Sequence, residues 1–151
     1  MIGVEERLKR LGIELPAPPP PVANYVATRR SGNLLFVSGR KSELTGTVGM
    51  DVDGSAAKEA ARRTMITLLA IIKAEIGDLD RIGGVVKMNG YVRSSPDFEG
   101  QPEVIDGASD LLVEVFGEAG RHARTATGAQ PPFGATVQLE LVIELKDPEQ
   151  R

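Results

Sequence analysis

Two stretches of the chain carry hydrophobic residues at the period of an α-helix. From Ser55 to Ile76 apolar residues recur three and four positions apart, with Ser55 as a capping residue and Gly77 as an end signal. The same spacing returns from Pro102 to Phe116, which Gly117 follows. We therefore expect two amphipathic helices. Their buried stripes are expected to include Ala57, Ala61, Met65, Leu68 and Ile72 in the first, and Val104, Ala108, Leu111, Leu112 and Val115 in the second.

The N-terminal part of the chain predicts a short helix followed by a stiff extended segment. Residues 4–11 place Val4, Leu8 and Leu11 on one helical face, and Gly12 provides a stop. Residues 15–21 are mostly proline, which lacks an N–H donor and favours an extended chain. We interpret this arm as a lead-in packed on the surface rather than as a ligand for a partner domain.

Alternating polar and apolar positions predict the first two strands. Tyr25 to Arg29 and Leu34 to Ser38 flank the turn residues Ser31-Gly32-Asn33, which predicts a hairpin. Gly39 to Gly54 is rich in glycine, serine and threonine, and it has no helical period. We expect a loop there, of a kind that often borders a ligand site.

A third strand is predicted from Ile82 to Val92, between the two helices. In strict alternation, Val85 and Lys87 share one face and Val86 and Met88 share the other.

Two more strands are predicted at the C-terminal end, over His122 to Gln130 and Thr136 to Leu145, with a turn at Pro131 to Gly134. The last strand alternates almost perfectly, which places Glu140 on the face opposite its neighbour Leu139. The predicted order is ββαβαββ, an α+β class with one sheet packed against two helices. The other sheet face stays uncovered, and we expect it to close against further copies of the chain.

Composition narrows the classes of function. The chain has 151 residues, enough for one compact domain, and its net charge of −3 gives no general attraction to nucleic acid. It has no cysteine and one histidine, so disulfides, thiolate chemistry and a zinc site are disfavoured. We find no apolar run long enough for a membrane span and no signal peptide, and we expect a cytoplasmic protein.

Five segments in sequence resemble the landmarks of one family. They are Asn24-Tyr25-Val26, Leu35 to Gly39, Val86 to Val92, Ala123 to Ala126, and Val137 to Glu140. Their order and spacing are similar to those of the RidA/YjgF family of imine deaminases, also labelled endoribonuclease L-PSP. The resemblance covers residues 24–145.

The resemblance implies a chorismate-mutase-like fold assembled as a homotrimeric barrel, with ligand sites between subunits. It also implies hydrolysis of 2-imino acids to 2-keto acids and ammonia without a cofactor or metal. We expect an N-terminal helix and proline-rich arm over residues 1–23, a family-like domain over 24–146 and a C-terminal tail over 147–151.

The resemblance also assigns candidate site residues. It implies Arg124 as the carboxylate-binding group and Glu140 as the acidic catalytic group. A guanidinium suits a planar carboxylate because it offers two parallel charge-assisted hydrogen bonds, and a carboxylate can position water and relay its proton. The expected substrate-binding residues are Tyr25, Ser38, Gly39, Ala126 through its backbone N–H, and Asp106.

Several alternatives stay open. Glu140 is as readily a solvated carboxylate, Tyr25 an interface aromatic, and His122 a structural residue rather than a general base. The chain has Gln130 where better known members have an arginine, and Asp106 where asparagine is expected, which puts a negative charge near an anionic substrate. The rival functions are a non-catalytic module that binds small carboxylates and, ranked last, an endoribonuclease.

Overall fold

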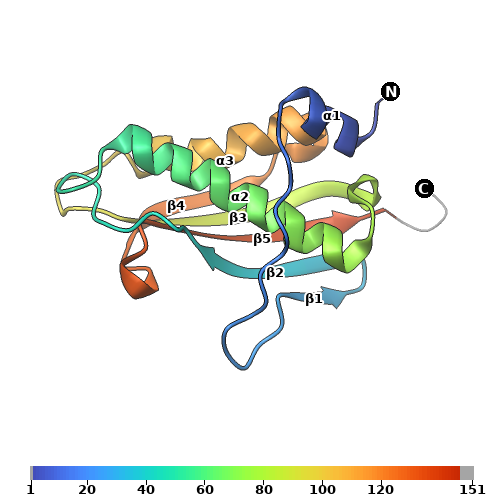
Figure 1. The fold of residues 1–151 in the computed structure, drawn as a ribbon, viewed down its shortest axis with the longest axis horizontal. Coiled ribbons are helices and arrows are strands. Elements are labelled where there is room, and N and C mark those ends of the chain that lie inside the picture. The colour runs from blue at the N-terminus through green and yellow to red at the C-terminus, as the bar shows by residue number, and fades with distance from the viewer. Residues whose placement is uncertain (1, 147–151) are drawn as a thin grey trace.

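The computed structural model describes residues 2–146, which form one sheet with helices packed on it (Figure 1). The predicted C-terminal tail, residues 147–151, lies outside the described residues. In chain order the elements are α1 (Val4–Arg10), β1 (Thr28–Ser31), β2 (Leu34–Lys41), α2 (Gly54–Ile76), η1 (Leu79–Arg81), β3 (Ile82–Arg93), α3 (Gln101–Phe116), η2 (Gly117–Gly120), β4 (Ala123–Ala129), η3 (Pro132–Gly134) and β5 (Val137–Leu145).

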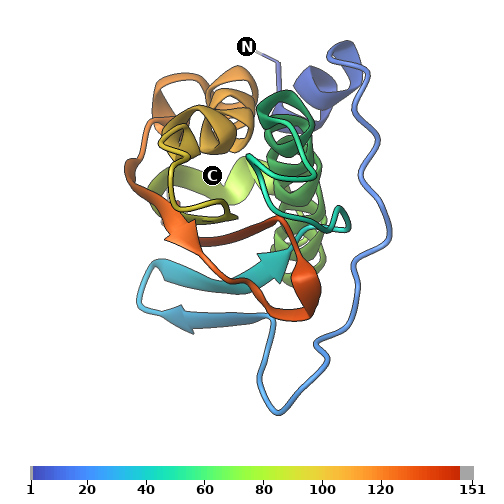
Figure 2. The same cartoon turned by 90° about the vertical axis from the view of Figure 1, so that its left-hand side faces the viewer.

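The five strands lie in the order β1-β2-β5-β3-β4, so β1 and β4 form the two edges. β3 and β4 are parallel, whereas the other neighbouring pairs are antiparallel. Figure 2 shows α2 and α3 together on one side of the sheet. The predicted α+β class and the ββαβαββ order are confirmed.

The core lies between the sheet and the two long helices. Every residue predicted for the two apolar stripes is buried, and so are the alternate β5 residues from Val137 to Leu145. α2 and α3 approach closely at Gly107, where an added Cβ would lie 2.1 Å from the carbonyl oxygen of Lys58. A glycine is therefore required at this crossing.

The start of α2 differs from the prediction. The capping residue is Asp53 rather than Ser55, because the Asp53 carboxylate accepts a hydrogen bond from the Ala56 N–H at 2.8 Å. Ser55 donates its hydroxyl to the same carboxylate at 3.0 Å. These hydrogen bonds, the Ala56 N–H first, lower the pKa of Asp53.

Two further predictions near the N-terminus are wrong in detail. The first strand begins at Thr28 rather than Tyr25, because Ser31 pairs with Leu34 across a two-residue turn and the pairing ends at Thr28 with Val37. The first helix ends at Arg10 rather than at Leu11, which caps its C-terminus and is 41% exposed.

Strand β3 departs from strict alternation. The pairing with β5 shifts between Val85 and Lys87, which inserts one extra residue as a β-bulge. Val85 is therefore buried on the helix side with Met88, and Val86 is 40% exposed. The predicted faces of Val85 and Val86 are wrong for this reason.

The proline-rich arm runs as an extended segment from α1 across α2 toward β1, along the outside of the molecule (Figure 1). Its residues are mostly exposed, while Ile13 and Leu15 at its start pack against the core. A surface lead-in is thus confirmed. Among the described helices, none has the length and apolar character that a bilayer crossing needs.

Candidate functional site

The pairing register places Arg124 and Glu140 on opposite faces of the sheet. Arg124 lies beside Met88, which pairs in turn with Leu141, and both of these neighbours are buried under the helices. Glu140 pairs with Asn89 in the adjacent row, so it faces the other way. Within one chain, the two residues expected to share a site are separated by the sheet.

Arg124 stands at the edge of the sheet, where α3 passes over β4. Its Nη1 donates to Asp106 Oδ1 at 2.6 Å and to Ser109 Oγ at 3.2 Å. Asp106 and Ser109 are three positions apart on α3 and therefore share a helical face. The Arg124 side chain is 24% exposed.

The side-on edge of the Arg124 guanidinium, formed by Nε and Nη2, is not used by the hydrogen bonds to Asp106 and Ser109. Both hydrogen bonds recorded for the guanidinium use Nη1, and within residues 2–146 no acceptor is recorded for Nε or Nη2. Nε and Nη2 form the fork that binds a carboxylate with two parallel bonds. Asp106 thus orients Arg124 without occupying that fork.

A hollow of about 610 Å³ opens beside Arg124. It is lined by Arg124, Ser109, Asp110, Val113, Glu114, Arg121 and His122. The position of this hollow at the sheet edge means that a second molecule of protein could cover it.

His122 belongs to the same cluster as Arg124 and Ser109. Its place there was not predicted from the sequence. Its Nε2 lies 2.9 Å from Ser109 Oγ, and its Nδ1 lies 2.7 Å from the carbonyl oxygen of Gly120. One signal was present in the sequence: Asp106 and Ser109 have the i, i+3 spacing of one helical face, and His122 and Arg124 the i, i+2 spacing of one strand face.

Glu140 lies in a second cluster, on the sheet face away from the helices. It accepts hydrogen bonds from Tyr91 Oη at 2.6 Å and from Asn89 Nδ2 at 3.4 Å. The hydrogen bond to the Glu140 carboxylate raises the pKa of Tyr91, so this phenol stays a donor at neutral pH. Glu140 is therefore an oriented, half-buried carboxylate.

Tyr25 and Ser38 share a hollow of about 410 Å³ with Glu140. Ser38 donates its hydroxyl to the carbonyl oxygen of Val26 at 2.7 Å, which holds the chain segment that carries Tyr25. Tyr25 itself is 43% exposed. The structure thus groups these three expected residues on one face.

Gly39 and Ala126, the remaining expected residues, have no functional group in a side chain. A Cβ on Gly39 would lie 2.7 Å from the Gln138 side chain, and the last prolines of the arm lie close by. Ala126 is partly buried on β4, two residues after Arg124 and on the same, helix-facing side. Ala126 therefore accompanies Arg124, while Gly39 accompanies Ser38.

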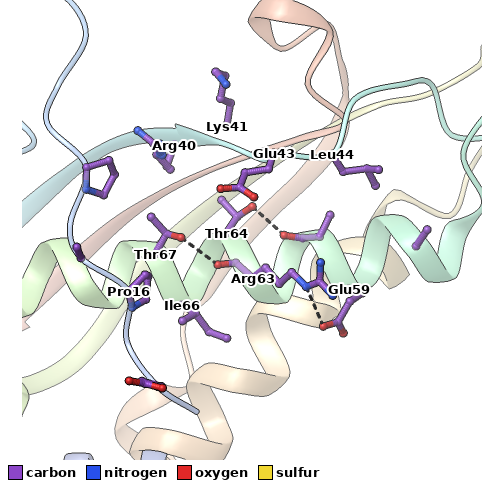
Figure 3. A pocket seen from close by; sticks show the side chains of 15 residues that line it. Pro16, Arg40, Lys41, Glu43, Leu44, Glu59, Arg63, Thr64, Ile66 and Thr67 are labelled. Atoms are coloured by element: carbon purple, nitrogen blue, oxygen red, sulfur yellow. Dashed lines mark hydrogen bonds and ion pairs between the residues drawn. The ribbon is translucent and has the colours of Figure 1, made fainter.

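A third hollow, of about 560 Å³, lies between the proline arm, α2 and the end of β2 (Figure 3). Its charges are mixed: Arg40, Lys41 and Glu43 line it from the end of β2 and the residues that follow, and Arg63 pairs with Glu59 at 3.4 Å. None of the seven expected site residues lines it. Across the described part of the chain, no cluster of three or more potential metal ligands is present.

Comparison with known proteins decides the family. A family model described as "YjgF/chorismate mutase-like, putative endoribonuclease" matches residues 5–144. The chain belongs to the YjgF family. The resemblance noted in the sequence is thereby confirmed.

Individual relatives of the YjgF-family chain agree with this assignment. Protein TCP17 of Trypanosoma cruzi is 44% identical over 152 residues, which cover 95% of each protein. The structure of protein Atu1372 from Agrobacterium tumefaciens is similar with a TM-score of 0.87 at 45% identity, covering 95% of this chain and 92% of that one. A "putative endoribonuclease" from Shewanella oneidensis MR-1 gives a TM-score of 0.91 at 32% identity, covering 95% and 100%.

Proposed function

We propose that this YjgF-family protein hydrolyses 2-imino acids to 2-keto acids and ammonia, with the substrate carboxylate held by Arg124. The observations that carry the proposal are the side-on edge of the Arg124 guanidinium, which has no acceptor within residues 2–146, and the α3–β4 hollow that Arg124 lines. A 2-imino acid presents a planar carboxylate next to the electrophilic C=N carbon. A fork that binds the carboxylate therefore fixes the reacting carbon as well.

Asp106 shapes the charge of this site. Its carboxylate lies 2.6 Å from Arg124 Nη1, so the pair is close to neutral before a ligand arrives. The incoming carboxylate meets the Nε and Nη2 edge, while Asp106 stays on Nη1. The pairing fixes the orientation of Arg124 and weakens its attraction for anions, which favours ligands that use the fork over those that need only positive charge.

The chemistry requires little from the protein beyond positioning. Water adds to the C=N carbon and the π electrons move to nitrogen, which gains a proton to give a carbinolamine. The C–N bond then breaks, nitrogen leaves as ammonia after a second protonation, and the hydroxyl proton is released as C=O forms. Imines hydrolyse readily in water, so orientation of substrate and water supplies most of the needed acceleration.

The Glu140 cluster joins the Arg124 site only when several copies of the chain assemble. β1 and β4 are free edges, and Phe36, 45% exposed on the face away from the helices, accompanies Glu140 there. A homotrimer in which the β4 edge of one copy meets the β1–β2 edge of the next would bring Arg124 toward Tyr25, Ser38 and Glu140 of the neighbour. A head-to-tail contact of this kind closes into a ring. In this assembly Glu140 orients the water.

The test is release of 2-keto acid from imines generated by an amino-acid oxidase or a serine/threonine dehydratase. The wild-type protein is expected to raise the rate of release. Arg124→Ala should abolish the effect, and Arg124→Lys should lower kcat/KM about 10- to 100-fold, because an ammonium lacks the fork and a charged hydrogen bond contributes about 1.5–3 kcal/mol.

Arg10→Ala is the control, since Arg10 is an exposed arginine of α1 that does not line this hollow and pairs with Glu6 at 3.4 Å. This variant should retain wild-type activity. A wild-type protein that binds 2-keto acids without accelerating imine hydrolysis would instead be a carboxylate-binding module. RNA cleavage that depends on Arg124 would favour the endoribonuclease named in the family description.

A further inference from the structure

The proline arm keeps open the hollow of about 560 Å³ that it forms with α2 and the end of β2 (Figure 3). Leu15 packs against the core at one end of the arm, and the Ala27 carbonyl oxygen accepts from the Ser38 N–H at 2.9 Å at the other. For residues 16–22 no backbone hydrogen bond is recorded among the described residues. Because proline stiffens this stretch, it spans the hollow as a preformed wall. Hollows of this size are typical of small-molecule sites.

The floor of the hollow is the face of α2 that carries Ala60 and Thr64. Both residues are buried, and Ile66 and Thr67 beside them are partly buried. The Thr64 hydroxyl donates to the carbonyl oxygen of Ala60 at 2.7 Å, and the Thr67 hydroxyl donates to that of Arg63 at 3.3 Å. A hydroxyl has a single proton, so toward a ligand both oxygens can only accept. The floor therefore offers an apolar surface and two acceptors.

The charged side chains around the hollow are balanced in sign. They are Arg40, Lys41 and Arg63 against Glu14, Glu43 and Glu59. Arg63 pairs with Glu59 at 3.4 Å, and Lys41 Nζ lies 5.8 Å from the centre of the Phe133 ring. Within residues 2–146, none of the recorded ion pairs includes Arg40, Glu43 or Glu14. One guanidinium and two carboxylates are thus available to a ligand.

Arg40 and Glu43 lie on one wall, at the end of β2 and just after it. Ser42, which is buried between them, donates its N–H to the Val137 carbonyl oxygen at 2.7 Å and its hydroxyl to the Leu44 carbonyl oxygen at 2.8 Å. The backbone of this wall is therefore fixed before a ligand arrives, which lowers the entropic cost of binding. A positive and a negative group on one fixed wall suit a ligand whose own opposite charges lie close together.

We propose that this hollow is a second ligand site, for an α-amino acid with an apolar side chain. The ligand carboxylate binds Arg40 through two parallel hydrogen bonds, and the ammonium donates to Glu43 and the threonine hydroxyls. The apolar side chain lies against Ala60 and Ile66. Because the lining has no net charge, an anion or a cation alone gains less from it than a zwitterion. Pyruvate, which has no ammonium, does not suit the site.

This site is separate from the Arg124 hollow, with which it shares no lining residue. The proposal does not rest on imine hydrolysis, and neither one depends on the outcome for the other.

Calorimetric titration of the full chain with L-leucine tests the ligand class. Wild-type protein should bind leucine saturably with a Kd of about 1 mM or below. Glycine keeps both charges but lacks the apolar side chain, and isoamylamine keeps that chain and the ammonium but lacks the carboxylate. Each should bind at least about 10-fold more weakly, because one of the three contacts is lost. No binding of leucine, or equal binding of either comparison ligand, would overturn the proposal.

Two variants test the position of the site. Arg40→Gln and Glu43→Gln should each weaken leucine binding about 10- to 100-fold, the loss expected for a hydrogen bond to a charged group. Arg30→Gln and Glu75→Gln are the matched controls, since both residues are exposed and lie outside the hollow. Both controls should bind leucine as the wild type does.

Arg124→Ala separates the two hollows. This variant should bind leucine as tightly as the wild type, because Arg124 does not line the hollow under the arm. Leucine binding that is lost in Arg124→Ala, or that survives both Arg40→Gln and Glu43→Gln, would overturn the second site. Either result would leave the imine hydrolysis to be judged by its own assay.

Discussion

At the residue scale, the site depends on how one guanidinium divides its hydrogen bonds. Asp106 and Ser109 take Nη1, and in the part of the chain that the structure describes no acceptor occupies the side-on fork of Arg124. An arginine whose whole guanidinium were paired could not exchange partners without leaving Asp106 a half-buried, unpaired charge. The arrangement is thus compatible with both a fixed side chain and a ligand.

Replacement of Asp106 tests the charge balance of the pair. Asp106→Asn keeps an acceptor for Arg124 Nη1 but removes the negative charge near the bound carboxylate. Pyruvate should then bind about two- to fivefold more tightly, in line with the 0.2–1 kcal/mol typical of partly exposed charge pairs. Calorimetric titration of both proteins provides the comparison, and weaker binding by the variant would show that Asp106 serves mainly to hold Arg124 in place.

Candidate site residues could be named from the sequence only where family landmarks fall on them, and their roles stay predictions. Arg124 and Glu140 could be named, but their opposite faces depend on the register between β3, β4 and β5, which no local pattern fixes. The contact of Ser109 with His122 joins residues 13 positions apart through packing of α3 on β4. Spacing alone indicated which residues share a face, not which faces meet.

At the element scale, periodicity predicted both long helices and the ββαβαββ order of elements along the chain, because the buried face of each element is decided locally. The bulge at Val85 to Lys87 was not predictable, since it arises from pairing with β5. The same holds for the cap of α2, where Asp53 precedes Ser55 and both are good capping residues.

Gly107 tests the packing of α3 on α2. In Gly107→Ala the new methyl group would lie 2.1 Å from the Lys58 carbonyl oxygen, so the helices must separate. We expect a loss of about 1–3 kcal/mol in the free energy of unfolding, the usual cost of overpacking. Urea denaturation measures it.

Gly54→Ala is the control for this helix pair. Gly54 begins α2, and a Cβ there meets nothing within 4 Å among the described residues. The variant should be as stable as the wild type or slightly more stable. Equal stability of both alanine variants would contradict the close approach of the helices.

At the scale of the whole molecule, the sheet has one face under the helices and one face exposed. The exposed face carries Phe36 and the Glu140 cluster, and the edges β1 and β4 are unpaired in the single chain. The proposed contact with other copies would cover these exposed side chains. The proposed site between copies requires that contact.

Phe36→Asp tests the assembly. Wild-type protein should elute as a trimer with its mass measured by light scattering, and the variant should shift toward monomer, because a charge would be buried at the contact. Leu11→Asp is the control, since Leu11 is similarly exposed at 41% but lies at the end of α1. A monomeric wild type, or equal effects of the two variants, would contradict the proposed ring.

The central claim is that a small carboxylate binds the free edge of Arg124, and a crystal structure with pyruvate tests it most directly. We predict the carboxylate on Nε and Nη2 of Arg124, with Asp106 still on Nη1, at a boundary between two copies. Pyruvate bound instead beside Arg40 and Lys41, or an Arg124 fork closed by protein carboxylates in the presence of saturating pyruvate, would contradict the account.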